Sequence, residues 1–244
     1  MAMINKENNK MWHIDVDSND IGQYVILPGD PFRTDLIAKF LDDAKLVAHK
    51  REHKTWTGYL DGVKVSVTST GMGGPSAAIA VEELIAAGAH TFIRVGTAGT
   101  CSEESKDESL DGLLCQAAVR DEGTTISYVP LAYPAIADFE VLSALKESVD
   151  EKGLNYLMGI IHCKDSFYAE LEPETMPNSD YLNSRWKAWE QSSVIGSEME
   201  TAALFIVSSV RRVRAGAIMN FKDMDTTIQI ACDAIRKLIK KDNQ

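Results

Sequence analysis

The chain has few cysteines and no long apolar run. Its four cysteines lie far apart in 244 residues, and no two form a Cys-x-x-Cys pair. This spacing predicts reduced thiols rather than a disulfide or zinc framework. No apolar segment is long enough to span a bilayer, and the polar segment Met1–Met11 lacks the apolar core of a secretion signal. These absences favour a cytoplasmic protein.

Positive charge is also scarce. The chain has 25 Lys and Arg residues against 36 Asp and Glu residues, which gives a formal net charge of −11. A nucleic-acid-binding surface is therefore not expected as the main function, and an anionic membrane would repel the chain. The composition is 45% hydrophobic and 25% charged, as in ordinary globular proteins. The length allows one large domain, which would span residues 1–244, or two small ones.

Short apolar segments alternate with segments of helical periodicity. Strands are predicted at residues 24–27, 46–50, 55–60, 63–67, 92–96, 113–120, 156–162 and 215–219. Helices are predicted at residues 31–41, 75–88, 138–151, 183–190, 200–209 and 227–240. Asp61-Gly62 predicts a hairpin turn between the third and fourth of these strands. The alternation favours an α/β fold in which helices flank a β-sheet.

The segment Phe92–Thr100, Phe-Ile-Arg-Val-Gly-Thr-Ala-Gly-Thr, has the most unusual composition. Arg94 lies inside its apolar run, and an unpaired buried guanidinium is very unfavourable. Arg94 must therefore meet an anion, which is either a fixed carboxylate of the protein or a bound ligand. Gly96 and Gly99 at the end of the strand would let the backbone approach a ligand closely.

Three other strand ends carry residues of similar interest. Gly29 and Arg33 follow the strand at 24–27, where Asp30 is placed to cap the next helix. The glycine-rich segment Ser69–Ser76 follows the strand at 63–67, and Ser197–Glu200 precedes another helix. Ligands of α/β sheets bind at the carboxyl ends of strands, so these segments are expected to converge. Taken singly, Arg33 also fits an exposed helix residue, and Glu198 and Glu200 fit carboxylates at a helix N-terminus.

The chemistry of these groups indicates a reaction between phosphate and a sugar. Two fixed guanidiniums, Arg33 and Arg94, match the charge and geometry of a phosphate dianion. Carboxylates near such a site accept hydrogen bonds from hydroxyl groups, which a sugar supplies. Together these groups suggest attack of phosphate on an anomeric carbon through an oxocarbenium-like transition state.

Several motifs resemble the bacterial uridine phosphorylase family, a branch of the nucleoside phosphorylase superfamily. They are Pro28-Gly-Asp-Pro31 with Arg33, His49-Lys-Arg-Glu52, Ser69-Thr-Gly-Met-Gly-Gly-Pro-Ser76, Arg94-Val-Gly-Thr-Ala-Gly99, Ala137-Asp-Phe-Glu140, Lys164-Asp-Ser-Phe-Tyr168 and Ser197-Glu-Met-Glu200. The resemblance runs from about Trp12 to Phe205 and resumes in the last helix. It implies a single α/β domain with a mixed central β-sheet flanked by helices.

The resemblance also implies a role for each matching residue. Phosphate would be bound by Gly29, Arg33, Arg51, Arg94 and Thr97. Ribose would be bound by His13, Met199 and Glu200, and the base by Ala98, Gly99, Phe167 and Glu170. Arg94 and Glu200 would be the catalytic residues of a pentosyltransferase that uses phosphate as co-substrate and needs no cofactor.

Two of these residues imply an oligomer. In the family, the counterparts of Arg51 and His13 reach the active site of a neighbouring subunit, so the resemblance implies a homo-oligomer, a dimer or a hexameric ring of three dimers. It also implies a K⁺ or Na⁺ ion at a dimer interface, near Glu52, Met72 and Ser76.

The sequence departs from the family in two places. The uridine branch reads the pyrimidine with a Gln and an Arg shortly after the Phe-Tyr pair, where this chain has Glu170 and Thr175 in the segment 169–177. An ionised Glu only accepts hydrogen bonds, and the positive charge that would stabilise a departing uracil anion is missing. The family also has a long flap before the last helix, which here is nearly absent.

These departures leave several hypotheses open. The first is a nucleoside phosphorylase acting on uridine, and its variant is a phosphorylase with a shifted base specificity. In the purine case Asp223 or Asp225 would protonate the leaving base, although Asp223 also fits a helix cap. The second is a degenerate homologue that binds nucleoside without turnover. A hydrolytic nucleosidase is disfavoured because water needs no dianion site, and a dinucleotide-binding fold lacks its Gly-x-Gly-x-x-Gly motif.

Overall fold

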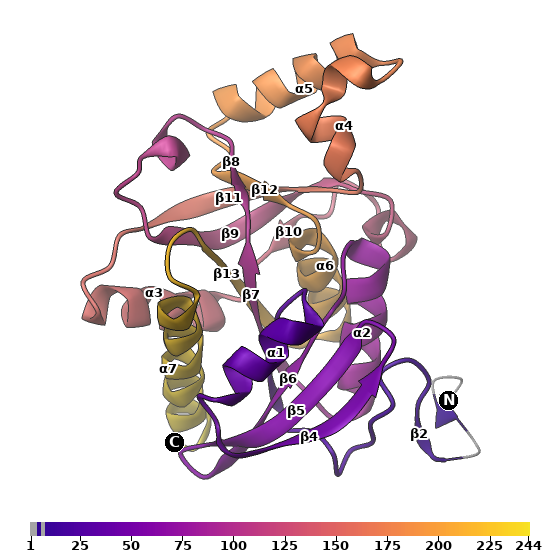
Figure 1. Cartoon of the computed structure of the whole chain (residues 1–244), viewed down its shortest axis with the longest axis vertical. Coiled ribbons are helices and arrows are strands. Elements are labelled where there is room, and N and C mark those ends of the chain that lie inside the picture. Colours follow the sequence, from indigo (N-terminus) through magenta and orange to yellow (C-terminus); the bar gives the residue numbers. More distant parts are fainter. Residues whose placement is uncertain (1–3, 6–7) are drawn as a thin grey trace.

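The computed structural model describes residues 4–5 and 8–244 (Figure 1). The strands are β1 (Ile4–Asn5), β2 (Lys10–Met11), β3 (Tyr24–Leu27), β4 (Asp42–Lys50), β5 (His53–Leu60), β6 (Val63–Thr68), β7 (Thr91–Thr97), β8 (Gly99–Thr100), β9 (Gly112–Asp121), β10 (Ala135–Ile136), β11 (Tyr156–Lys164), β12 (Gly196–Glu198) and β13 (Arg214–Asn220). The α-helices are α1 (Pro31–Ala38), α2 (Gly74–Ala86), α3 (Phe139–Glu151), α4 (Phe167–Leu171), α5 (Ser179–Gln191), α6 (Thr201–Arg211) and α7 (Met224–Asp242).

A mixed β-sheet forms the centre of this α/β domain. Its strand order is β4-β5-β6-β3-β7-β13-β9-β11-β12-β8, and β10 pairs with β9. The central strands β6, β3, β7 and β13 are parallel, whereas β4, β5 and β6 form an antiparallel meander. The predicted α/β class and mixed sheet are confirmed.

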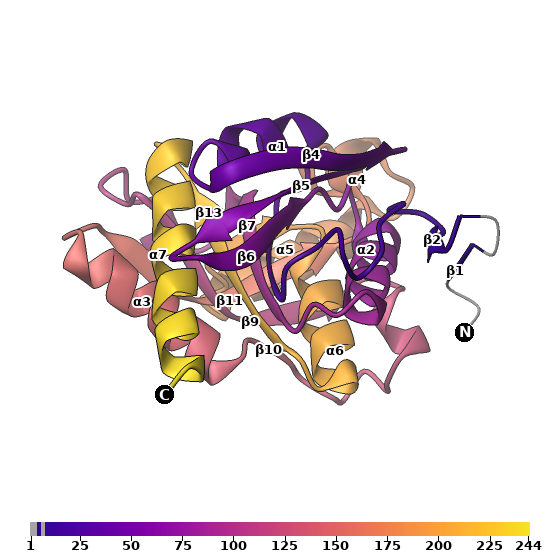
Figure 2. The ribbon, with the colours of Figure 1, turned by 90° about the horizontal axis from the view of Figure 1, so that it is seen from below.

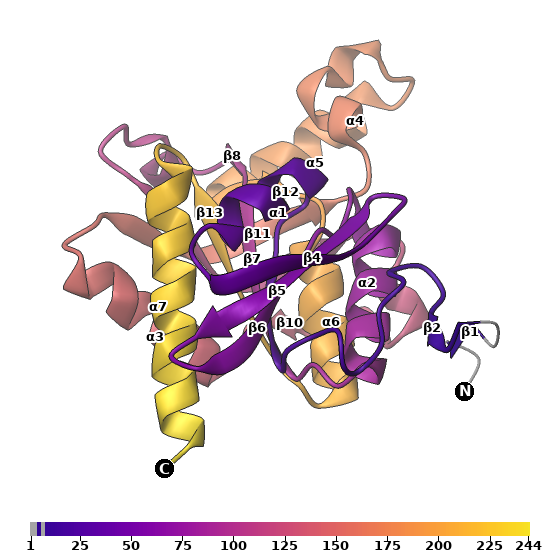
Figure 3. The ribbon, with the colours of Figure 1, turned by 60° about the horizontal axis from the view of Figure 1, so that its bottom comes forward.

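Helices cover both faces of the sheet (Figures 2 and 3). Helices α2 and α6 pack on one face in a core that includes Phe92, whereas α1, α3 and α7 pack on the other in a core that includes Ile93 and Val95. Successive side chains of a strand point to opposite faces. Arg94 in β7 therefore points to the same face as Phe92, the face on which α6 lies.

The sheet curls so that one of its ends meets its centre. Ala98 alone separates β7 from β8, and β8 pairs with β12 at the far end of the strand order. Ser197 pairs with Gly99 and Gly196 with Thr100 in this antiparallel ladder. The carboxyl end of β7 is thereby held against the segment that leads into α6.

Local signals in the sequence are confirmed at the helix ends and at the hairpin. Asp30 accepts a 2.9 Å hydrogen bond from the backbone N–H of Phe32, and Asp138 caps α3 in the same way. Asp61 and Gly62 have positive φ angles of 50° and 77° in the hairpin between β5 and β6, as a type I′ turn requires. Asp223 caps α7, which confirms the capping interpretation.

Other predicted elements differ in extent or were missed. β4 begins at Asp42 rather than residue 46, and α5 begins at Ser179 rather than residue 183. The short elements α4, β8, β10 and β12 were not predicted. The three strands have two or three residues each, too few to show a periodicity, and their pairing depends on distant partners.

The four cysteines are thiols, as their spacing in the sequence predicts. Cys101, Cys115, Cys163 and Cys232 are free thiols and all are buried. Burial raises the pKa of the Cys101 and Cys232 thiols to about 12, so both stay protonated at neutral pH. Among the described residues, no helix is long and apolar enough to cross a membrane.

The C-terminal end of α7 is held to the sheet by an ionic cluster, which leads to a prediction about acid stability. Asp242 accepts hydrogen bonds from Arg214 and, at 2.6 Å, from the Tyr24 hydroxyl, and these partners lower the pKa of Asp242 to about 2. A carboxyl group with a lowered pKa stabilises the fold above its ordinary pKa and loses that effect as the pH falls toward 2. Because the cluster is partly exposed, we expect Asp242→Asn to lower the free energy of unfolding by about 1 kcal/mol at pH 7.

Urea denaturation from pH 7 to pH 2 measures this difference. It should shrink as the pH falls from about 4 to about 2, because the wild-type carboxylate then becomes protonated. Asp150→Asn is the control, since within the described part of the chain Asp150 forms an ion pair only with Lys146, on the exposed surface of α3. A difference for Asp242→Asn that stays constant at all pH values would contradict the prediction.

Candidate functional site

A cleft of ≈ 700 Å³ lies where the ends of β3, β7 and β11 approach the start of α6. It is lined by most of the residues predicted for the site, which are Gly29, Arg33, Glu52, Met72, Arg94, Thr97, Ala98, Gly99, Phe167, Glu170, Met199 and Glu200. Helices α4 and α5 lie over the end of the sheet where β8 and β12 pair (Figure 1). The sheet edge predicted to collect these residues therefore does so.

Arg94 is the buried cation of this cleft. Its side chain is only 5% exposed, and it donates through Nε to Glu198 at 3.1 Å and through Nη2 to Glu200. Burial lowers the pKa of Arg94, but the two carboxylates outweigh that effect and raise it. The third nitrogen, Nη1, is buried and has no hydrogen-bond partner among the described residues. Arg94 thus pairs with internal carboxylates and still has one donor group for a ligand.

Arg33 supplies a second positive charge. It lies in the first turn of α1, and within the described chain its side chain has no hydrogen bond or ion pair. Burial and the charge of Arg94 lower the pKa of Arg33, and the charge of Asp30 opposes them in part. Both guanidiniums line the same cleft. Two such groups favour an anion with several oxygens.

Glu200 lies between Arg94 and the glycine-rich turn, and it accepts hydrogen bonds from both. The backbone N–H of Gly73, whose φ angle is 87°, donates to Glu200. Burial and the neighbouring Glu198 raise the pKa of the Glu200 carboxyl, while Arg94 lowers it. Glu198 accepts from the backbone N–H groups of Glu200 and Thr201, so it caps α6 and holds Arg94 in place. The expectation of a carboxylate at a helix start is thus confirmed for Glu198. Glu200, the N-cap residue of α6, also lines the cleft.

Glu170 lies at the other end of the cleft, in α4 beside Phe167. Its Oε1 accepts from Lys164, and its Oε2 accepts from the Ser197 hydroxyl at 2.6 Å and contacts His162 at 3.3 Å. Burial raises the pKa of Glu170, but His162, Lys164 and Ser197 outweigh that effect and lower it. Glu170 is therefore an ionised carboxylate already engaged by three side chains.

Lys164 and Ser197 line the cleft, although the sequence does not single them out as site residues. Each falls in a motif that resembles the family, so the neighbouring residues are the available signal. Lys164 is the last residue of β11, and no local pattern shows that its side chain turns into a cleft. Glu198, a carboxylate expected near the ligand, lines the cleft as well.

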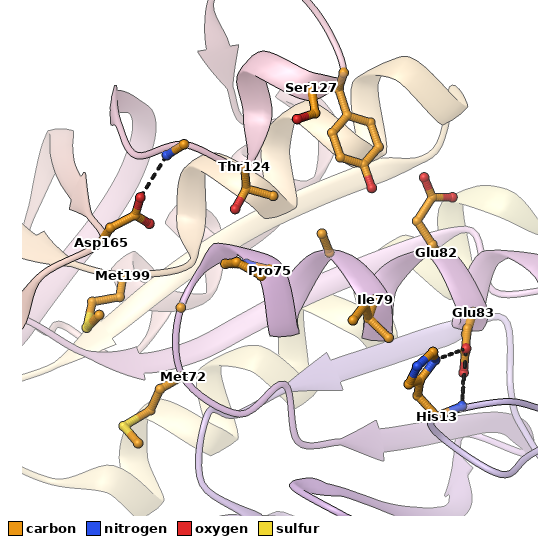
Figure 4. A pocket seen from close by; sticks show the side chains of 14 residues that line it. His13, Met72, Pro75, Ile79, Glu82, Glu83, Thr124, Ser127, Asp165 and Met199 are labelled. Atoms are coloured by element: carbon orange, nitrogen blue, oxygen red, sulfur yellow. Dashed lines mark hydrogen bonds and ion pairs between the residues drawn. The ribbon is translucent and has the colours of Figure 1, made fainter.

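Three predicted residues, His13, Arg51 and Ser76, do not line the cleft. His13 lines a separate hollow of ≈ 920 Å³ on the outer side of α2, where its Nδ1 lies 2.6 Å from Oε1 of Glu83 (Figure 4). This hollow shares Met72 and Met199 with the cleft. Arg51 lies in the turn between β4 and β5 with a φ angle of 56°.

Ser76 instead donates a 2.9 Å hydrogen bond to Glu52, the second residue predicted near a monovalent cation. The third, Met72, is 85% exposed at the rim of the cleft. Over residues 4–5 and 8–244, no group of three or more His, Cys, Asp or Glu side chains could hold a metal ion.

Comparison with known proteins decides the family. The model of the phosphorylase superfamily matches residues 23–234, which include every cleft residue named above. The chain belongs to the phosphorylase superfamily. A uridine phosphorylase of Treponema pallidum is 42% identical over 95% of this chain and 95% of its own length.

Other members of the phosphorylase superfamily are also similar to this chain. A uridine phosphorylase of Thermococcus kodakarensis is 41% identical over 87% of the chain and 76% of its own length. A guanosine phosphorylase of Halorubrum lacusprofundi is 36% identical over 86% of the chain and 81% of its own length. The resemblance inferred from the motifs is thereby confirmed over most of the chain.

Proposed function

We propose that the chain is a uridine phosphorylase, a pentosyltransferase that converts uridine and phosphate to uracil and ribose 1-phosphate. The observation that carries the proposal is the pair of guanidinium groups at the cleft, one with a buried unpartnered Nη1 and the other without an ion pair in the described chain. Hydrolysis would not need this arrangement, because water carries no charge. The names of the uridine phosphorylases among the relatives support uridine as the nucleoside.

In this reaction a phosphate oxygen attacks C1′ of the ribose while the bond from C1′ to the base nitrogen breaks. Arg33, Arg94, Thr97 and Gly29 bind the phosphate on one side of the ring. Glu200 accepts hydrogen bonds from the ribose hydroxyls, and its charge stabilises the oxocarbenium-like transition state. Phe167 and the backbone at Ala98 and Gly99 contact the base.

Phosphate is the only co-substrate in this proposal. A K⁺ or Na⁺ ion near Glu52, Met72 and Ser76, and a cytoplasmic location, remain predictions. The buried reduced thiols support the location, because such thiols are typical of a reducing compartment.

The direct test is an assay of base release. Purified protein is incubated with uridine, thymidine, inosine or adenosine, each with and without phosphate. We expect phosphate-dependent release of uracil from uridine. Equal release without phosphate would support a nucleosidase, and no release together with thermal stabilisation by uridine and phosphate would support a degenerate binding protein.

A shift to purine bases is the second candidate. The guanosine phosphorylase among the relatives supports it, as does the loss of the Gln and Arg that read uracil. Residues 221–223 alone separate β13 from α7, so no long flap closes over the base end. Faster release from inosine than from uridine in the same assay would favour this candidate.

We further propose that the active form is a homo-oligomer, a dimer or a ring of three dimers, in which His13 and Arg51 serve a neighbouring active site. In the free chain His13 lines the hollow beside α2, where Glu83 also accepts from the backbone N–H groups of His13 and Ile14 (Figure 4). Three hydrogen bonds to one buried carboxylate fix the imidazole and the backbone that carries it.

This arrangement gives a substrate-specific prediction. His13→Ala should raise KM for uridine about 10-fold, because one hydrogen bond to the ribose 5′-hydroxyl is lost. KM for 5′-deoxyuridine, which has no such hydroxyl, should not change. His49→Ala is the control, since His49 is exposed on β4. Equal effects of His13→Ala on both nucleosides would contradict the assignment.

A further inference from the structure

Lys164 is a buried cation at the base end of the cleft. It is 7% exposed and ends strand β11, and its Nζ donates to Oε1 of Glu170 and, at 2.7 Å, to the hydroxyl of Ser197. The ammonium lies 5.7 Å from the centre of the Phe167 ring, the residue proposed to contact the base. Lys164 thus lies beside the position of the base rather than that of the phosphate.

A network of charged side chains holds Lys164 in this position. Glu170 also contacts His162, whose Nε2 lies 2.8 Å from Asp121, and Asp121 pairs with Arg185 on α5. Burial lowers the pKa of His162, but Asp121 and Glu170 outweigh that effect and raise it. Each side chain of this network is fixed by its neighbours, so the Lys164 ammonium has little freedom to reorient.

An ammonium group has three N–H donors, and the described residues accept from two of those of Lys164. The remaining donor is available to a molecule in the cleft that Lys164 lines. Glu170 cannot supply such a donor, because an ionised carboxylate only accepts, and its charge would repel an anionic leaving group.

We propose that Lys164 stabilises the departing base and thereby replaces the Arg that this chain lacks; the inference rests on the proposed function. As the bond from C1′ to N1 breaks, its electron pair stays on the base and spreads to the carbonyl oxygens, while a phosphate oxygen bonds to C1′. No proton has to move. Lys164 donates to a carbonyl oxygen and offsets the new negative charge. Glu170 is a positioning residue that holds the ammonium, which revises the direct base contact predicted for it.

The test compares two leaving groups in the full-length protein. 5-Fluorouracil is a stronger acid than uracil, so its anion needs less stabilisation as it departs. Lys164→Gln should lower kcat about 100-fold with uridine, and about 10-fold with 5-fluorouridine. Lys164→Arg keeps the charge and should retain most of the wild-type activity. Lys152→Gln is the control, because Lys152 pairs with Asp233 far from the cleft residues.

Equal losses with the two nucleosides would overturn the proposal, because a purely structural role does not depend on the leaving group. If Lys164→Gln does not fold, the double variant Lys164→Met/Glu170→Leu replaces the buried ion pair by two apolar side chains, and the same comparison applies. Failure of the wild-type protein to release uracil would instead refute the proposed function. The two failures are therefore distinguishable.

Discussion

Replacing Arg94 with Met should lower phosphate-dependent kcat/KM for uridine by about 1000-fold. Nη1 of Arg94 is a buried donor without a partner among the described residues, and a donor aimed at a reacting anion accounts for about 100- to 1000-fold in rate. The same change leaves Arg33 as the only guanidinium lining the cleft in the described part of the chain. Steady-state kinetics with uridine and varied phosphate measures the effect.

The control must separate chemistry from folding, because Met at position 94 leaves Glu198 and Glu200 without their cation. Loss of one partner from a buried ion pair costs about 3–5 kcal/mol of stability. Arg94→Lys keeps the charge but cannot bridge both carboxylates and a ligand. We expect it to melt near the wild-type temperature and to raise KM for phosphate about 100-fold. Arg236→Met and Glu104→Ala, both away from the cleft, should retain activity, and losses equal to those of Arg94 would contradict the site.

Arg94 also shows what the sequence could predict about the site. An arginine in an apolar strand demands an anion, and the sequence allowed either an internal carboxylate or a ligand. The structure combines both, since two nitrogens meet Glu198 and Glu200 and the third is unpartnered in the described chain. Local sequence reasoning identifies the demand for an anion, whereas the number of partners depends on residues 104 and 106 positions away.

The curling of the sheet could not be predicted for a similar reason. Gly99 pairs with Ser197 through two strands that are too short to carry a hydrophobic period. Pairing across so long a separation is favoured only after the central strands and α6 have packed. This pairing also positions Lys164 at the cleft. Lys164 donates a hydrogen bond to Ser197, and Ser197 lies in β12, the strand that the pairing fixes. The helix caps Asp30 and Asp138 and the hairpin turn, by contrast, depend on neighbouring residues, and these predictions are confirmed.

Glu200→Gln is expected to have the second-largest effect, a decrease of about 100- to 1000-fold in kcat with uridine. The substitution keeps the shape of the side chain and its acceptor oxygen for the Gly73 N–H, but it removes the negative charge beside the ribose. That charge matters most when positive charge develops on the sugar ring, so kcat should fall in the variant. For a substrate whose kcat/KM is limited by binding, kcat/KM should fall less than kcat.

The dependence on substrate and pH distinguishes this role from a structural one. 2′,3′-Dideoxyuridine lacks the hydroxyls that Glu200 contacts, so its rate should fall much less than that of uridine in the variant. Burial and Glu198 raise the pKa of Glu200, so wild-type kcat should decline on the acid side at a higher pH than an ordinary Glu would produce, because the protonated acid carries no charge. Glu200→Gln should lack this decline, and the exposed Glu104→Gln should keep it. If Glu200→Gln loses activity equally on both nucleosides and keeps the acid decline, Glu200 only supports the fold. The charge of the Glu200 carboxylate would then act on neither the hydroxyls nor the transition state.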